Sequence, residues 1–184
     1  DAVAVAVYAT DGGATIRALN GGWLSVIAGD QPNNLFAAHN EIVRGSFGSG
    51  NDVGILWDNG FVDFDGGEGN NYVEAFDNDI VSLRFGDGNN TVIADHNDIA
   101  YTMFGLGENY ASGSYNNFFG VGGGGGGGTT VHGWGNNSFS VSLEGGDNDV
   151  GAYYNLYSSI FTGDGKDRVD VVGEDGSFAE VYTY

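Results

Sequence analysis

Cysteine is absent from this 184-residue sequence, and proline occurs once, as Pro32. Without cysteine the chain can form neither disulfide bonds nor thiolate metal sites. No apolar run approaches the roughly 20 residues that a membrane-spanning helix needs. The sequence therefore predicts no membrane insertion.

Basic residues are scarce as well, with five Lys and Arg against 25 Asp and Glu and a formal net charge of −20. Nucleic-acid backbones require a Lys/Arg surface, so this charge argues against a nucleic-acid partner. An anionic membrane surface is disfavoured for the same reason. The charge suits a soluble protein, divalent cations or a salty exterior.

Glycine and aromatic residues are abundant. The chain contains 35 glycines, 14 % aromatic residues and 41 % apolar residues. High glycine content without a collagen triplet, beside β-branched and aromatic residues, is typical of a turn-rich all-β protein.

An internal 19-residue repeat runs through the sequence. Gly-x-Gly triplets begin at Gly48, Gly67, Gly86 and Gly105, and another begins at Gly163. A column of Asn follows the same spacing, with one inserted residue that we place in or near the glycine run 122–128. Its members are Asn40, Asn59, Asn78, Asn97, Asn116, Asn136 and Asn155. A repeat of this length is typical of a solenoid.

Each repeat unit, or coil, contains a glycine corner, an alternating strand, an Asn corner and a second alternating strand. Coil 86–104, GDGNNTVIADHNDIAYTMF, shows the pattern clearly. Alternate positions such as Val92 and Ala94 must face one way, into a core. We therefore predict an all-β fold for residues 1–184: one flattened, two-sheet parallel β-solenoid domain of about nine coils, roughly 43 Å long at ~4.8 Å per coil.

Charged residues give an independent check on this register, because equal positions of neighbouring coils lie side by side in a solenoid. Four of the five basic residues lie one full period away from an acid. The pairs are Arg84 with Asp65, Lys166 with Asp147, Arg168 with Asp149, and Arg44 with Asp63.

The two Asn columns, one at each corner, are interpreted as structural ladders. A buried Asn offers two donors and an acceptor, so each amide can bond the next one along the stack. Asn also tolerates the left-handed backbone conformations that corners need.

The glycine corners resemble the repeats of RTX, or haemolysin-type, calcium β-rolls. The segments that carry the resemblance are GSGND at 48–52, GDGNN at 86–90, GGDND at 145–149 and GDGKD at 163–167. The resemblance implies a secreted or surface solenoid and calcium bound between turns by Asp carboxylates and backbone carbonyls. Here the coil is longer by a single residue than the double nonapeptide of that family, one corner carries Gly-x-Gly, and the Asp position is usually Asn.

A His/Asp strip precedes the Asn corner on four consecutive coils. It contains His39, Asp58, Asp77 and His96, with Asp79 and Asp98 two residues after the last two positions. Carboxylates and imidazoles together suit a divalent metal. The same residues could form an acid/base pair acting on a polysaccharide, or simply start Asx-type turns.

Large aromatic residues occupy the other face of the first strand. We predict an interface formed by Phe36, Trp57, Tyr72, Phe76, Trp134 and Tyr153. Exposed apolar area of this kind marks a binding surface, and aromatic rings also stack on sugars. The alternative is an inverted strand, with these residues in the core.

Neither end of the sequence shows a polar cap, so we expect open strand edges that pair with a neighbour, giving head-to-tail filaments. The opening DAVAVAVYAT lacks Met and a basic region, which we interpret as a removed signal peptide or an excised piece.

The leading functional hypothesis is a secreted or cell-surface structural solenoid for self-assembly or adhesion, with a surface protein or glycan as further partner. The alternative is a calcium-binding accessory module of a secreted polysaccharide-modifying enzyme. A third hypothesis is a β-helix enzyme with the His/Asp strip as its site, although no nucleophile triad or phosphate loop can be identified.

Overall fold

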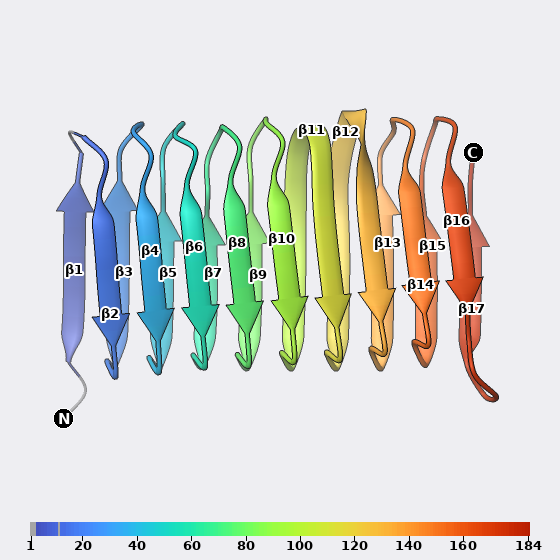
Figure 1. The fold of residues 1–184 in the computed structure, drawn as a ribbon, viewed down its shortest axis with the longest axis horizontal. Coiled ribbons are helices and arrows are strands. Elements are labelled where there is room, and N and C mark those ends of the chain that lie inside the picture. Colours follow the sequence, from blue (N-terminus) through green and yellow to red (C-terminus); the bar gives the residue numbers. More distant parts are fainter. Residues whose placement is uncertain (1–2, 11) are drawn as a thin grey trace.

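The computed structural model describes residues 3–10 and 12–184 and shows an all-β parallel solenoid of about nine turns. Strands run alternately down one flat face and up the other, and successive coils stack side by side along the long axis (Figure 1). The predicted fold class is therefore confirmed. The described residues form no helix, and thus none that could span a membrane.

One face, here called the first sheet, starts each coil. It contains β2 (Thr15–Leu19), β4 (Asn34–Ala38), β6 (Val53–Trp57), β8 (Tyr72–Phe76), β10 (Thr91–Asp95), the second halves of β11 (Ile99–Ser114) and β12 (Phe118–Trp134), β14 (Asp149–Tyr153) and β16 (Arg168–Val172). The second sheet contains β1 (Ala4–Ala9), β3 (Trp23–Ala28), β5 (Ile42–Ser46), β7 (Phe61–Asp65), β9 (Ile80–Arg84), the first halves of β11 and β12, β13 (Ser138–Leu143), β15 (Tyr157–Phe161) and β17 (Phe178–Tyr182).

The strand register follows the 19-residue period. Val73 pairs with Val92, and Val92 pairs with Ala111. The period lengthens by a single residue at one place, because Gly107 pairs with Gly126 while Asn109 pairs with Thr129. The inserted residue therefore lies inside the glycine run, where it was predicted.

The core lies between the sheets and is made by the predicted alternate positions. Val73, Val92 and Val131 are fully buried, and so are Ala75 and Ala94. The alternative in which the first strand is inverted is therefore wrong. Small residues in the first sheet leave room for rings of the second sheet, such as that of Phe119 opposite Gly113.

The charged residues stack in the predicted register but do not all pair as expected. Arg168 lies 3.8 Å from Asp149, whereas Arg84 bonds Asp63 at 2.7 Å and not Asp65. The Asp65 carboxylate instead accepts a hydrogen bond from the backbone of Gly67. Arg84 can reach Asp63 because side chains lean along the strand direction.

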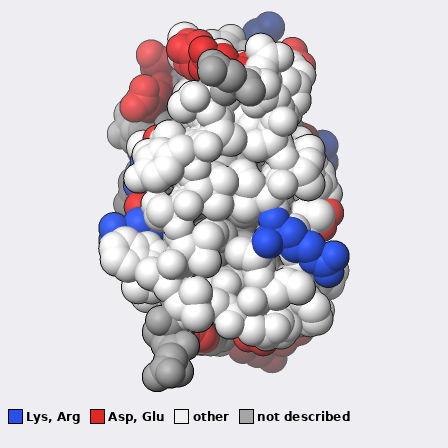
Figure 2. Space-filling model, turned by 90° about the vertical axis from the view of Figure 1, so that its left-hand side faces the viewer, with Lys and Arg blue, Asp and Glu red and all other residues white. Residues whose placement is uncertain are grey.

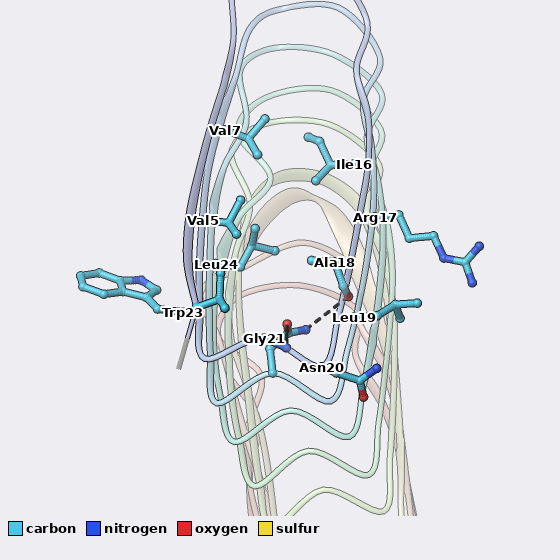
Figure 3. A pocket seen from close by; sticks show the side chains of 12 residues that line it. Val5, Val7, Ile16, Arg17, Ala18, Leu19, Asn20, Gly21, Trp23 and Leu24 are labelled. Atoms are coloured by element: carbon cyan, nitrogen blue, oxygen red, sulfur yellow. Dashed lines mark hydrogen bonds between the residues drawn. The ribbon is translucent and has the colours of Figure 1, made fainter. Parts of the chain in front are cut away.

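Both ends of the described solenoid leave core side chains in contact with solvent. At the first end, Val5 is 46 % exposed and borders an open pocket of about 330 Å³ together with Val7, Ile16 and Leu24 (Figure 3). At the other end, Val181 of β17 is 42 % exposed. Figure 2 views the first end and shows a broad uncharged surface with basic side chains on both sides.

Candidate functional site

The corner that joins the first sheet to the second is built on the buried Asn column. Asn78 donates its side-chain amide to the carbonyls of Leu56 and Phe76 and to Asn97 Oδ1, each at 3.0 Å. Its own Oδ1 accepts from the backbone and the side chain of Asn59. This pattern continues through Asn155, so the coils that carry Asn40 to Asn155 are bonded to one another by side chains as well as strands.

The opposite, glycine-rich corner contains a second buried column. Its buried members are Asn33, Asp52, Asn71, Asn90, Asn109, Thr129 and Asn148, and the half-buried Asp167 ends the column. Asn71 donates to the carbonyl of Gly69 and to Asn90 Oδ1. The two Asp members accept through Oδ1 but leave Oδ2 buried without a hydrogen-bond partner. Burial raises the pKa of Asp52, although its bonds from Asn33 act in the other direction.

The residue directly before each Asn of the first column has a left-handed backbone, and so does Asn20 at the equivalent position before Gly21. Its φ lies between 51° and 57° at Asn20, His39, Asp58, Asp77, His96, Tyr115 and Tyr154, and is 63° at Gly135. Asn, Asp and His are enriched in this region, which is strained for larger residues. The backbone thus gives a structural reason for the His/Asp strip. In the sequence, Asn20 and Gly135 occupy the same coil position as the His/Asp strip. These two residue types are the signal that the position has a left-handed backbone.

The six predicted metal residues lie along this corner but do not converge. His39 Nδ1 is 2.7 Å from Asp58 Oδ2, and Asp77 Oδ2 accepts a bond from Trp57 Nε1 at 3.1 Å. His96 stacks on the Tyr115 ring at a centroid distance of 5.3 Å. Asp79 and Asp98 are exposed, and Asp98 accepts a bond from Asn117. Within residues 3–10 and 12–184, no three acidic or His side chains are grouped closely enough to hold a metal ion.

The predicted aromatic residues all lie on the outer face of the first sheet. Trp57 is 45 % and Trp134 44 % exposed, while Phe36, Tyr72, Phe76 and Tyr153 are half-buried. Tyr72 bonds Glu74, and this hydrogen bond raises the pKa of the Tyr72 hydroxyl to about 12. Sequence reasoning missed Tyr115 and Tyr154, because these residues occupy the left-handed position after the strand.

Two shallow pockets open along the same corner. The first, about 320 Å³, is lined by Phe36, Ile55, Trp57, Phe76, Asp77 and His96. The second, about 520 Å³, is lined by Tyr115, Trp134, Gly135, Tyr154 and Glu174. We call the residues that line these two pockets, together with Tyr153, the aromatic edge. Its arrangement is suited to stacking on flat ligands and to accepting hydrogen bonds from them.

Comparison with known proteins gives no relative for this chain. No family model, no curated protein and no solved structure matches it. The resemblance to RTX-type repeats consequently depends on the glycine-corner motifs alone.

Proposed function

We propose that this protein is a structural β-solenoid of the cell surface or extracellular space that adheres to an extended glycan through its aromatic edge. The supporting observation is that Trp57 and Trp134 are nearly half exposed on one edge, each within a pocket. Exposed apolar surface of this extent marks a binding site. The C–H groups of a sugar ring pack against the negative face of such rings.

The spacing of the two pockets favours a polymer over a small ligand. Trp57 and Trp134 lie about four coils apart, which is roughly 19 Å at ~4.8 Å per coil. The coils between them contribute Phe76, His96 and Tyr115 to the same edge. A chain of linked sugars lying along the solenoid axis would contact both pockets at once and gain affinity from both.

The extracellular location is supported by two features of the sequence. The acidic composition, with a net charge of −20, suits a salty exterior. The glycine corners resemble those of a family of secreted solenoids.

The test is retention of the purified chain on immobilised polysaccharides. Trp57→Ala and Trp134→Ala should each weaken retention, and the double variant should abolish it. Tyr157→Ala is the matched control, because Tyr157 is an exposed aromatic residue of the second sheet and lines neither pocket of the edge. Equal retention of all these proteins on every polysaccharide that the wild type binds, or no retention of the wild type at all, would refute the proposal.

A second candidate function is the calcium-stabilised accessory module, and the buried oxygens of Asp52 and Asp167 favour it. Calcium prefers carboxylate and carbonyl oxygens as ligands. The Oδ2 atoms of Asp52 and Asp167 both lie buried without a hydrogen-bond donor. The other column members are Asn and Thr, so these two positions are where the chain would hold a cation. If calcium binds there, EGTA should lower the melting temperature of the wild type but not that of the Asp52→Asn, Asp167→Asn double variant.

A further inference from the structure

This inference rests on the proposed adhesive function and narrows its ligand. From the charges along the aromatic edge, we propose that the edge takes a glycan whose sugars carry protonated amino groups. Such a ligand combines a ring that stacks on aromatic side chains with a cation that pairs with carboxylates.

Each of the two pockets combines aromatic rings with one carboxylate. The first contains Asp77 beside Trp57 and Phe76, with the imidazole of His96 in the same lining, and the second contains Glu174 beside Trp134 and Tyr154. Neither pocket is lined by Lys or Arg. Asp58 lies next along the same corner, and the whole chain carries a net charge of −20. An acidic glycan would be repelled from this edge, whereas a cationic glycan would be attracted to it.

The carboxylates have oxygens available for a ligand. Asp77 uses Oδ2 to accept a bond from Trp57 Nε1, and Oδ1 accepts none within the described part of the chain. The Glu174 carboxylate likewise accepts no bond there, since Ser177 binds the Glu174 backbone carbonyl instead. An ammonium group between ring and carboxylate would gain both a cation–π contact and a charged hydrogen bond.

The molecule already contains two contacts of this chemistry. The Arg17 guanidinium lies 5.3 Å from the centre of the Phe36 ring, and Phe36 lines the first pocket. Arg44 lies 5.9 Å from the Trp23 ring. The Arg17–Phe36 contact lies on the first sheet, beside the aromatic edge, and the Arg44–Trp23 contact lies on the second sheet, so outward-facing rings on both sheets pair with cations.

The backbone at this edge argues for a glycan and against a peptide that adds a strand. The N–H groups of His39, Asp58 and Asp77 donate to the carbonyls of Trp57, Phe76 and Asp95 at 3.0–3.2 Å. The backbone groups along the edge therefore bond from coil to coil and offer no ladder to a further strand. Recognition must come from side-chain rings and carboxylates.

The experiment is titration calorimetry with three ligands of equal length in mildly acidic buffer: a β-1,4-linked glucosamine hexamer, its fully N-acetylated form, and hexalysine. We expect the glucosamine hexamer to bind roughly tenfold more tightly than the acetylated hexamer. Added salt should reduce this preference.

Matched variants separate charge from stacking. Asp77→Asn and Glu174→Gln should together remove the preference while the acetylated hexamer still binds. Asp164→Asn removes one exposed acid at the opposite corner and should leave the preference unchanged.

The possible outcomes are distinct. Equal affinity for both hexamers overturns the inference and leaves the proposed function standing. Binding of neither hexamer also overturns the inference, whereas the proposed function is refuted only if the wild type is retained on no immobilised polysaccharide or the tryptophan variants are retained equally. Hexalysine binding as tightly as the glucosamine hexamer also overturns the inference, because the occupant would then be a basic protein segment.

Discussion

Individual residues of this chain are selected by backbone conformation as much as by chemistry. The left-handed position of this corner has a φ between 51° and 63°, which costs little for Asn20, Asp58 or Gly135 and more for Tyr115 and Tyr154. Two bulky residues at strained positions therefore stand at the second pocket. Strain of this kind is found at functional sites, which agrees with a binding role for this edge.

Asp52 makes stability depend on pH in a direction opposite to that of a salt-bridged acid. Its pKa is raised by burial, so the folded state binds a proton more tightly than the unfolded state. The contribution of Asp52 to stability is complete below the ordinary pKa of 3.8 and is lost as pH rises through the higher pKa of the folded state. We expect Asp52→Asn to stabilise the protein at neutral pH by about 1–3 kcal/mol, because Asn supplies the missing donor.

The measurement is urea unfolding of both proteins across a pH series. The difference between them should vanish at the acidic end, where Asp52 carries its own proton. A variant that is less stable than the wild type at neutral pH would show that the carboxylate, or a cation bound to it, is needed in this column.

Asn78 provides the corresponding prediction for the amide column. Asn78→Ala leaves the buried backbone and side-chain donors of Asn59 without their acceptor and removes the bond that Asn78 donates to the Leu56 carbonyl. Unfolding free energy should fall by at least about 3 kcal/mol. Asn117→Ala, which removes an exposed amide of the same corner, should change it by no more than about 0.5 kcal/mol. Similar losses for both variants would mean that the buried ladder is not a principal source of stability.

Among the elements, strands β11 and β12 depend on glycine for two different reasons. A Cβ at Gly113 would lie 2.3 Å from Phe119 Cδ1, so this glycine makes room for a ring of the opposite sheet. In the run around the inserted residue, Gly126 and Gly128 have positive φ values of 85° and 95°. The first glycine is needed for packing and the others for the path of the corner.

Alanine substitutions should distinguish these roles. Gly113→Ala forces Phe119 to move, and overpacking of this kind costs about 1–3 kcal/mol. At Gly125 the nearest atom to a new Cβ is Leu106 Cδ2 at 3.4 Å and φ is not positive, so Gly125→Ala should be neutral or stabilising by up to about 1 kcal/mol. Thermal unfolding of both variants is the measurement, and a stable Gly113→Ala protein would contradict the packing role.

The elements also show what the sequence can predict. Register, core positions and the insertion follow from the 19-residue spacing, because parallel coils repeat the same environment at each step. Side-chain partners do not follow, since they depend on rotamers: Arg84 reaches past Asp65 to Asp63, and Asp77 binds Trp57 in place of a second acid. The structural reason for the His/Asp strip, a left-handed backbone at each of its positions, depends on the φ values of the corner, which the spacing alone does not show.

At the scale of the whole molecule, both outermost strands belong to the second sheet. β1 pairs with β3 at one end, and β17 pairs with β15 at the other. A head-to-tail stack that places β1 on β17 would separate β2 from β16 of the neighbour by two strand spacings, about 9.6 Å. A dimer whose two copies are related by a two-fold axis parallel to the strands avoids this gap. In such a dimer the first ends face each other, and β1 of each copy lies one strand spacing from β2 of the other copy and antiparallel to it.

Any self-association of this chain through its first end should therefore stop at a dimer. Val5→Lys, which places a charge in the open pocket of that end, should abolish the dimer, while Val181→Lys at the other end should not. Sedimentation velocity over a concentration series measures this. Filaments that are blocked by either substitution would instead support the predicted head-to-tail stack.

The stacking of equal coils also determines how the protein would respond to force. Among the residues that the structure describes, each coil bonds only to its immediate neighbours, through strands and Asn columns that join equal positions of successive coils. A pull applied to one terminus would detach coils in order from that end, each releasing roughly 65 Å of extended chain. Force against extension should accordingly trace a staircase of nearly uniform steps, so that the chain lengthens gradually under load.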